Sequence, residues 1–412
     1  MANYLFSSYN ALLKIFKEGA YVSDAVYKEI EGDENADIIY RIVMGVLEKN
    51  NELDFKLSKL VDKRPKSAIC IVLKQGIYCL DYMDSLPDYA VVNNSVDLAK
   101  TINKGAYKGF VNAVLKRAAT EKISLPDGAF ALSIRYGYPE WAINKIFSEY
   151  GREKGKEIVA AKKRGGTHVR TNNLIYSDEK FERDLENAGY KFEKTKTGYY
   201  VSMNPLLKKL FIEGRITYQS LTSTYAALAL DVKDGQNVLD VCSAPGGKAI
   251  FVAEKNPTAN VVACDIHPHR VELIGAYARR MHVKNVTPTL FDGTAFNKEW
   301  AGHFDRVLCD VPCSAMGVVK KQPDVLLNRN ENDIAALKKV QYSILDNAKN
   351  YVKRGGLLVY STCTIFKEEN DDNVEEFLKN NNDFEKYPSE FDGQYLPCDT
   401  HDGFFIRRLR RK

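Results

Sequence analysis

Two cysteines lie at positions where an α/β sheet places its chemistry. Cys313 follows the apolar run 304–308 and Cys363 follows the apolar run 357–360, within the segments Asp-Val-Pro-Cys-Ser and Ser-Thr-Cys. Short apolar runs of this kind predict buried strands, and α/β sheets bind ligands at the carboxyl ends of their strands. We therefore expect both thiols at one edge of a sheet, where a thiolate can act as a nucleophile.

A thiolate nucleophile suits one difficult reaction, the methylation of carbon 5 of a pyrimidine. That carbon is not nucleophilic until a thiolate adds at carbon 6; after methyl transfer the carbon-5 proton leaves and the thiol is eliminated. The ring also needs charge stabilisation at N3, which a neighbouring protonated carboxyl such as Asp310 can provide. Either cysteine alone is more simply a buried thiol at a strand end, but the pair beside a cofactor loop favours catalysis.

A third segment predicts that cofactor loop. The run 237–241 leads through glycines into a helix, and glycine lets a ligand approach the backbone closely because it has no Cβ. The spacing excludes a P-loop, since Cys242 and Ala249 stand where that motif requires Gly and Ser or Thr. There is no G-x-G-x-x-G fingerprint either. The residues of the loop are Cys242, Ser243, Ala244, Pro245, Gly246, Gly247 and Lys248.

Two aspartates narrow the choice of ligand. Asp265 ends the next predicted strand, where a carboxylate can accept both hydrogen bonds of a ribose diol, and Asp292 follows the third strand, within reach of an adenine. An adenosine without phosphates fits S-adenosylmethionine. Each aspartate alone is more simply a helix cap or a turn residue, but at strand ends in register with the loop the ligand role is favoured.

The composition limits the class of protein. A chain of 412 residues, 45% apolar and 27% charged, predicts a soluble multidomain protein. No apolar run approaches the ~18 residues that span a bilayer, and the start lacks a signal pattern, so we expect a cytoplasmic protein without membrane contact and, with no large apolar patch indicated, a monomer. The eight cysteines form no C-x-x-C pair and the six histidines do not cluster near them, so no metal site is predicted.

The spacing of apolar residues divides the chain into three parts. In residues 1–124, apolar residues recur at spacings of three and four, which predicts an all-α bundle of about five to seven helices. A Leu-Pro-Asp-Gly turn at 125–128 opens a small α+β module over 125–214. Strands and helices then alternate over 215–412, which predicts a Rossmann-like α/β domain with a doubly wound parallel sheet. Its strands are expected at 237–241, 261–264, 287–290, 304–308 and 357–360, and its clearest helix at 331–352.

Positive charge is concentrated although the net charge is only +5. Residues 151–170 carry seven Lys or Arg against two Glu, and five of the last six residues are basic. A solvated basic surface explains this distribution as well as an RNA contact does.

These motifs resemble those of the RNA cytosine-5 methyltransferases. Residues 240–248, 310–314 and 361–363 are similar to motifs I, IV and VI of that family. The N-terminal helices resemble the RNA-binding domain shared with the antitermination factor NusB, best through 105–117, so the resemblance covers the whole chain. Ala315 and Ser243 replace the usual Gly and Ala, and both replacements are small enough to leave the chemistry intact.

The resemblance implies S-adenosylmethionine-dependent methylation of a cytosine in 16S rRNA or a small-subunit precursor, with the base turned out of its helix. By position it assigns the nucleophile to Cys363 and product release to Cys313, and the Ser-Thr-Cys motif favours RNA, since the DNA enzymes use the Pro-Cys cysteine. The loop 242–248 with Asp265, Asp292 and Asp310 would line the methyl-donor site. RNA would be held by the N-terminal bundle and by the basic stretch, at Lys162, Lys163, Arg164, Arg170 and Asn172.

Two other functions remain open from the sequence. A tRNA cytosine-5 methyltransferase would share the catalytic domain, although the NusB-like bundle argues for the ribosomal substrate. A non-enzymatic RNA-binding assembly factor would keep the methyltransferase fold as a scaffold, although the intact cysteine pair and donor loop argue against it.

Overall fold

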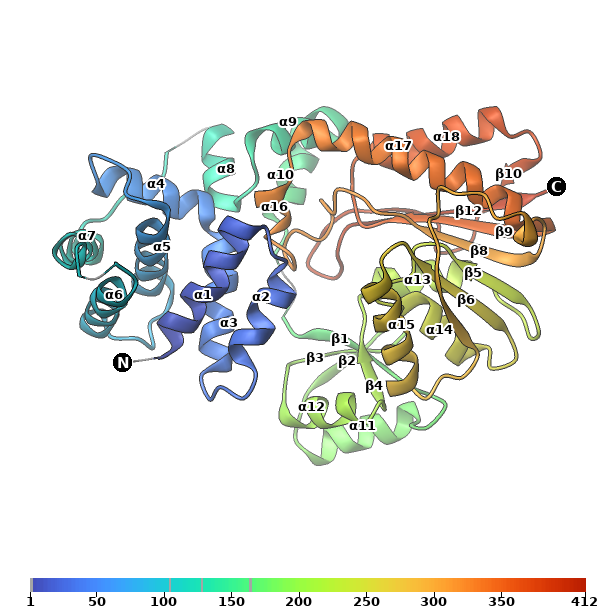
Figure 1. The fold of residues 1–412 in the computed structure, drawn as a ribbon, viewed down its shortest axis with the longest axis horizontal. Coiled ribbons are helices and arrows are strands. Elements are labelled where there is room, and N and C mark those ends of the chain that lie inside the picture. The colour runs from blue at the N-terminus through green and yellow to red at the C-terminus, as the bar shows by residue number, and fades with distance from the viewer. Residues whose placement is uncertain (1–2, 104, 127–128, 163–164) are drawn as a thin grey trace. The chain divides into compact units, whose positions relative to one another are not determined.

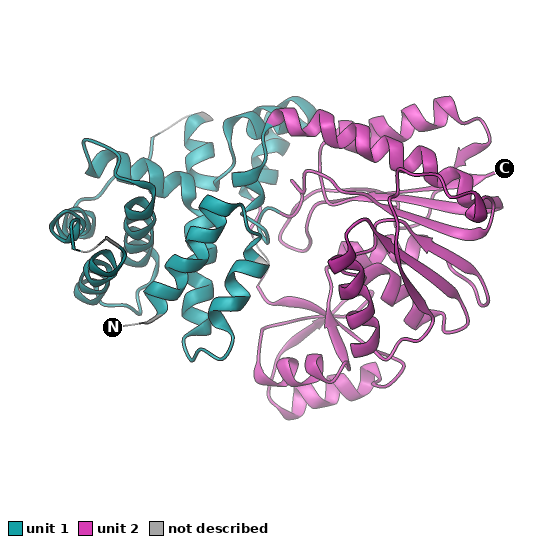
Figure 2. Cartoon of the chain, in the orientation of Figure 1, with its two compact units in different colours: residues 1–160, 319–330 teal, residues 161–318, 331–412 magenta. Residues whose placement is uncertain are grey.

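The computed structural model describes residues 3–103, 105–126, 129–162 and 165–412 (Figure 1). These residues form two compact units (Figure 2). Unit 1 contains residues 1–160 and 319–330, and unit 2 contains residues 161–318 and 331–412. Of the predicted turn at 125–128, residues 127–128 lie outside the described part of the chain, as do Lys163 and Arg164 of the basic stretch.

Unit 1 is helical wherever it is regular in its described residues, which confirms the predicted N-terminal bundle. Each of the first seven helices turns apolar side chains inward, and residues such as Leu12, Ile42, Leu73 and Leu115 are fully buried in one core. The helices are α1 (Asn3–Glu18), α2 (Val22–Ile30), α3 (Ala36–Glu48), α4 (Asn50–Leu60), α5 (Ser67–Tyr82), α6 (Asp88–Asn103), α7 (Lys108–Thr120), α8 (Ala129–Tyr136), α9 (Glu140–Tyr150), α10 (Arg152–Ala160) and α16 (Val325–Asn328).

The segment 319–330 joins unit 1 from far along the chain. The side chain of Leu327 packs against the helical core, and the Val22 backbone N–H donates to Asp324 Oδ2 over 3.4 Å. The Lys320 ammonium lies 5.4 Å from the centre of the Tyr138 ring. Unit 1 is therefore built from two separate stretches of sequence, a feature that the periodicity did not predict.

Unit 2 begins with a small antiparallel sheet in the order β2-β3-β1-β4. Its elements are β1 (Thr167–Thr171), α11 (Asp178–Asn187), β2 (Phe192–Lys194), β3 (Tyr199–Val201), α12 (Pro205–Ile212) and β4 (Ile216–Tyr218). Phe181, Leu185 and Leu207 close one face of this sheet. The division between the units at 160–161 lies inside the segment predicted as a separate middle module: its helices α8–α10 belong to unit 1, and its strands belong to unit 2.

The second sheet of unit 2 has the order β10-β12-β9-β8-β5-β6-β7, with β11 paired to β12. The strands are β5 (Asn237–Asp240), β6 (Asn260–Asp265), β7 (Val286–Leu290), β8 (Phe304–Asp310), β9 (Val352–Thr362), β10 (Phe384–Lys386), β11 (Gly393–Tyr395) and β12 (Phe404–Arg411). The predicted alternation gives the parallel part, β9-β8-β5-β6-β7. Strand β12 instead runs antiparallel to β9, because α18 is followed by strands rather than by another crossover helix.

Helices cover both faces of this sheet. They are α13 (Leu221–Ala229), α14 (Gly247–Lys255), α15 (Pro268–Arg280), α17 (Glu331–Ala348) and α18 (Asp371–Asn380), with short 3₁₀ turns η1 (Lys298–Trp300), η2 (Lys349–Tyr351) and η3 (Lys367–Glu369). Val238 and Leu308 join the core under α13–α15, whereas their neighbours Leu239 and Val307 join the core on the face of α17 and α18 (Figure 1). Alternate residues of each strand thus fill opposite cores, and the predicted Rossmann-like domain is confirmed.

Candidate active site

The two predicted cysteines lie side by side. Strands β8 and β9 are parallel neighbours with Asp310 opposite Ser361, so the loops that follow them leave the sheet at the same edge. The Sγ atoms of Cys313 and Cys363 are 3.2 Å apart, with Cys313 buried and Cys363 partly exposed. The hydrogen bond to Cys363 and burial together raise the pKa of the Cys313 thiol. The two thiols are therefore chemically unequal.

Asp310 stands between the thiols and the glycine loop. Its Oδ1 accepts a hydrogen bond from Ser361 Oγ (2.7 Å), and its Oδ2 lies 2.5 Å from Lys248 Nζ. Burial acts to lower the pKa of Lys248, but Asp310, Asp240 and Cys363 more than reverse this effect, so the pKa is raised and the ammonium is kept. A carboxylate and a cation are thus fixed beside the cysteine pair.

The glycine loop turns tightly between β5 and α14. The Ser243 backbone N–H donates to the Cys264 carbonyl (2.7 Å), and the Gly246 N–H donates to the Ser243 carbonyl (2.8 Å). Gly246 has φ +110° at the N-cap of α14, a conformation that side-chain-bearing residues rarely adopt. The turn presents backbone at the start of a helix, which suits close approach of a ligand.

Two buried polar groups in this turn lack partners of their own. Neither carboxylate oxygen of Asp240, nor the Ser243 hydroxyl, has a partner at hydrogen-bond geometry among the described residues, although Ser243 and the Cys242 backbone act to lower the pKa of Asp240. Burial and the nearby Asp310 charge raise the pKa of Asp240 to about 7. Unsatisfied polar atoms at the carboxyl end of a central strand fit a ligand that supplies the missing partners. Asp240 was quoted within the loop motif but was not among the expected site residues.

The two expected adenosine-binding aspartates occur in different surroundings. Asp265 is 4% exposed; its Oδ1 accepts from the His267 N–H and its Oδ2 lies 3.2 Å from Arg270. Arg270 also donates to the Ala244 carbonyl (3.0 Å), which ties Asp265 to the glycine loop. Asp292 is exposed and accepts from the backbone and hydroxyl of Thr294. Asp265 is thus held next to the glycine loop by Arg270, whereas Asp292 caps the turn after β7.

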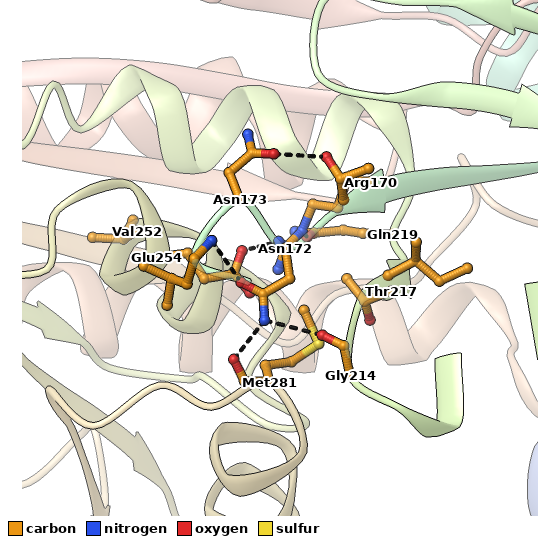
Figure 3. Close-up of polar contacts among 12 residues, drawn as sticks. Arg170, Asn172, Asn173, Gly214, Thr217, Gln219, Val252, Glu254 and Met281 are labelled. Atoms are coloured by element: carbon orange, nitrogen blue, oxygen red, sulfur yellow. Dashed lines mark hydrogen bonds and ion pairs between the residues drawn. The ribbon is translucent and has the colours of Figure 1, made fainter. Parts of the chain in front are cut away.

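Arg170 and Asn172, expected to contact RNA, lie inside unit 2 (Figure 3). Arg170 pairs with Glu254, donates to Gln219 Oε1 (2.7 Å) and stacks over the Phe251 ring. Asn172 Nδ2 donates to the carbonyls of Gly214 (3.0 Å) and Met281 (2.7 Å).

These contacts correct the expected RNA role of both side chains, because both are buried and held by protein partners; of the Arg170 guanidinium only Nη2 lacks a hydrogen bond. They join the small sheet to α14 and to the end of α15. Of the remaining predicted RNA contacts, Lys162 is exposed and Lys163 and Arg164 lie outside the described residues.

A buried polar cluster beneath the thiols was missed by the sequence reasoning. Glu369 is fully buried and accepts from the Ser314 N–H (2.8 Å), the Ser314 hydroxyl (2.5 Å) and Gln341 Nε2 (2.9 Å). Its segment, Lys-Glu-Glu-Asn-Asp-Asp, reads as a charged surface run, so no local pattern marks Glu369 as buried.

Backbone approach also fixes the loop after Cys313. The Gly317 N–H donates to the Cys363 carbonyl (2.9 Å), and the Gly403 N–H donates to the Gly317 carbonyl (2.8 Å). A Cβ on Gly317 would lie 2.4 Å from the Gly403 carbonyl oxygen, so no larger residue fits without backbone movement.

Comparisons with known proteins show the family to which the chain is similar. The profile of the 16S rRNA methyltransferase RsmB/F family matches residues 227–410, and the NusB family profile matches residues 7–120. The chain is 31% identical to the probable ribosomal RNA small subunit methyltransferase B of Bacillus subtilis, over 98% of this chain and 97% of that protein. It is 30% identical, with the same coverage, to the ribosomal RNA small subunit methyltransferase B of Photorhabdus laumondii.

Solved structures share the fold. The crystal structure of PH0851 superposes with a TM-score of 0.86 and 23% identity, covering 99% of this chain and 98% of that one. A methyltransferase homolog protein from Pyrococcus horikoshii has a TM-score of 0.60 and 25% identity, covering 70% of this chain and all of that one.

The fold and the site define an S-adenosylmethionine-dependent methyltransferase with a NusB domain at its N-terminus. The chain belongs to the ribosomal RNA small subunit methyltransferase B family. Within the described ranges, every helix is too short or too polar to cross a bilayer. The same residues bring no three His, Cys, Asp or Glu side chains together as metal ligands.

Proposed function

We propose that this protein methylates carbon 5 of a cytosine in 16S rRNA through a covalent bond between Cys363 and carbon 6 of the base. The observation that carries the proposal is the pair of thiols 3.2 Å apart, set beside the Asp310–Lys248 ion pair at the end of the donor loop. Two close thiols serve a reaction in which one sulfur adds to the base and the other assists its departure.

Cys363 is the nucleophile because it is the more exposed of the two thiols. Its thiolate adds to carbon 6 of the cytosine, and the electron pair of the 5,6 double bond moves toward carbon 5 and the N3 side of the ring. As the thiolate adds, a protonated Asp310 donates its proton to N3, and Lys248 and Ser361 hold the resulting Asp310 carboxylate. When carbon 5 accepts the methyl group, the N3 proton returns to Asp310.

Release requires that the carbon-5 proton leave and that Cys363 be expelled. We assign this step to Cys313, which takes up the carbon-5 proton as its own thiol proton passes to the departing Cys363 sulfur. The electron pair of the carbon–hydrogen bond re-forms the double bond, and both cysteines end as thiols. The distance of 3.2 Å between the sulfurs permits this transfer.

The methyl-donor site is assigned to the loop 242–248 with Asp240, Asp265, Asp292 and Asp310. The unpartnered Asp240 carboxylate and Ser243 hydroxyl, and the glycine turn at Gly246, fit S-adenosylmethionine. When bound there, S-adenosylmethionine supplies an electrophilic methyl group. Asp265, fixed by Arg270, is placed to bind the ribose diol.

The target cytosine has to leave its helix to reach two thiols at a sheet edge, so base flipping is part of the proposal. The family relatives are named for small-subunit rRNA, which favours 16S rRNA or a precursor particle over tRNA as the substrate. We assign RNA contacts to the NusB domain and to the exposed Lys162. The proposal also has the protein act as a monomer in the cytoplasm.

The substrate is tested with labelled S-adenosylmethionine on unmodified 16S rRNA, with tRNA in parallel and the product base identified by mass. We expect 5-methylcytosine in the rRNA alone. Labelled tRNA would transfer the proposal to a tRNA substrate, and donor binding without any product would favour a binding factor.

The cysteine roles are tested with Cys363→Ala and Cys313→Ala. We expect Cys363→Ala to lose methyl transfer by at least about 10³-fold, as for removal of a covalent nucleophile. Cys313→Ala should accumulate a denaturant-resistant protein–RNA adduct, seen on a denaturing gel. Cys398→Ala, which removes an exposed thiol elsewhere in unit 2, is the control and should behave as the unchanged protein. An active Cys363→Ala enzyme would refute the nucleophile assignment.

A further inference from the structure

The polar cluster beneath the thiols consists of Ser314, Gln341, Thr364, Glu369 and Asn373, which are all fully buried. Ser314 directly follows Cys313, and Thr364 directly follows Cys363. The two hydroxyl oxygens are 2.7 Å apart. This Glu369 cluster therefore connects the two cysteine loops.

The hydrogen atoms of the cluster can be assigned in one consistent direction. The Thr364 hydroxyl donates to Ser314 Oγ, and the Ser314 hydroxyl donates to Glu369 Oε2. Glu369 Oε1 accepts from the Ser314 backbone and from Gln341 Nε2. Burial raises the pKa of Glu369, and the three donors that converge on this carboxylate act to lower it without reversing the increase.

Gln341 connects Glu369 to the residue before Cys313 as well. Its Nε2 also donates to the Pro312 carbonyl (3.0 Å), and its Oε1 accepts from Asn373 (3.0 Å). Both residues that flank Cys313 are therefore anchored, directly or through Gln341, on Glu369.

Ionisable groups around Cys313 act in one direction. Cys363 and the buried Glu369 both raise the pKa of the Cys313 thiol. Burial raises the pKa of the Tyr360 hydroxyl, and Glu369 and Cys313 add to this increase. The cation of the site, Lys248, is paired with Asp310 and interacts with Cys363. The positive charge is thus associated with one thiol and the negative charge with the other.

We propose that Glu369 is the positioning residue that holds the two thiols in register and keeps Cys313 as the protonated member of the pair. The proposal rests on the proposed function and deepens it, because a Cys313 that retains its proton is the one that can hand it to the departing Cys363 sulfur. Glu369 acts through Ser314 and Thr364 and does not itself touch the substrate.

The charge on Glu369 is tested with Glu369→Gln, which keeps the shape of the side chain. The readout is the rate at which iodoacetamide alkylates Cys313 as a function of pH, measured by mass spectrometry in a Cys363→Ala background without RNA. We expect the profile to move to lower pH by about one unit, a tenfold faster alkylation below the midpoint. Glu254→Gln, which removes another buried carboxylate of unit 2, should not move it.

The positioning role is tested with Ser314→Ala, which keeps the Glu369 charge but breaks the hydroxyl link. A trivalent phenylarsenical bridges two close thiols, and we expect it to bind the Ser314→Ala protein about tenfold more weakly. The pH dependence of Cys313 alkylation should not change in this variant. In the otherwise unchanged enzyme, Glu369→Gln should accumulate the protein–RNA adduct, with the KM for S-adenosylmethionine unaltered.

The charge role of Glu369, its positioning role and the proposed function can each be refuted by a different result. An alkylation profile that Glu369→Gln leaves unmoved, or that Glu254→Gln moves equally, would overturn the charge role, whatever the enzyme does to RNA. Unchanged arsenical binding by Ser314→Ala would overturn the positioning role. A shifted profile in a protein without methyltransferase activity would support the Glu369 assignment and count against the proposed function alone.

Discussion

Asp240 is a buried carboxyl group whose protonation makes the stability of the fold depend on pH. It lies at the end of the central strand β5, 1% exposed, with neither oxygen hydrogen-bonded among the described residues. Its raised pKa, about 7, means that the folded state holds a proton that the unfolded chain releases near pH 4. The group therefore stabilises the fold at low pH relative to high pH, and the stability is lost as the pH rises toward 7.

We predict that Asp240→Asn flattens this pH dependence. In the unchanged protein the contribution of Asp240 falls by up to about 1.4 kcal/mol per pH unit between pH 4 and 7, and an amide cannot ionise. Urea unfolding of the ligand-free protein at several pH values measures the effect, and parallel curves for the two proteins would contradict it.

Asp305 provides a control of opposite sign. Burial acts to raise its pKa, but hydrogen bonds from the Asn237 N–H and Lys353 outweigh burial and lower it. Its stabilising contribution is present at neutral pH and is lost as the pH falls through its folded pKa. Asp305→Asn should therefore reduce stability at pH 7, where Asp240→Asn increases it.

At the residue scale, the sequence predicts those site residues that stand in a recognisable local pattern. Cys313, Cys363 and Lys248 lie together as expected. Arg170 was assigned to RNA because it lies in a basic stretch, but a strand turns it inward onto Glu254, 84 residues away. Glu369 could not be predicted either, because its partners come from segments 28 and 55 residues distant.

At the scale of elements, α14 performs two tasks. Its first residues follow the glycine turn, and Glu254 near its end pairs with Arg170 of β1. The side chains of Arg170 and Glu254 are 1% and 5% exposed, so the pair holds the small sheet of unit 2 to the helix that begins at the donor loop.

We predict that Arg170→Met destabilises the protein by about 3–5 kcal/mol, because it leaves a buried carboxylate without its partner. Adding Glu254→Gln should recover part of this loss, since the uncompensated charge is then removed as well. Chemical denaturation measures both variants. RNA affinity of the folded Arg170→Met protein should be unchanged, whereas Lys162→Ala, at an exposed position, should weaken it.

A double variant no more stable than Arg170→Met would contradict the buried-pair explanation.

The element scale also shows what apolar periodicity can and cannot predict. Helix α17 begins at residue 331 as predicted, and the five parallel strands lie where expected. The antiparallel β12 depends on long-range pairing with β9 that no local spacing encodes.

At the scale of the whole molecule, the segment 319–330 belongs to the helical unit although it follows the Cys313 loop in sequence. Its connection to both sides is covalent, with Val318 and Glu331 in unit 2. Boundaries drawn from composition divide a chain into consecutive pieces, and they cannot reveal a unit that is assembled from two separate stretches.

We predict that this segment shares the stability of unit 1. Leu12→Ala removes a fully buried side chain and should cost about 2–5 kcal/mol. Hydrogen exchange measured by mass spectrometry should then quicken in 325–328 together with α1 and α5, but not in β8. Leu358→Ala, at a fully buried position in β9, is the matched control and should quicken exchange in β8 instead. Exchange in 325–328 that follows β8 in both variants would contradict the assignment.

The discontinuous helical unit has a consequence for how the chain is made. A ribosome releases residues 1–160 first, yet the helix that packs against them, α16, emerges only after the glycine turn and Cys313 have been synthesised. The N-terminal domain is therefore completed late in translation, after four strands of the large sheet have left the exit tunnel, and its final folding step waits for the catalytic half of the polypeptide.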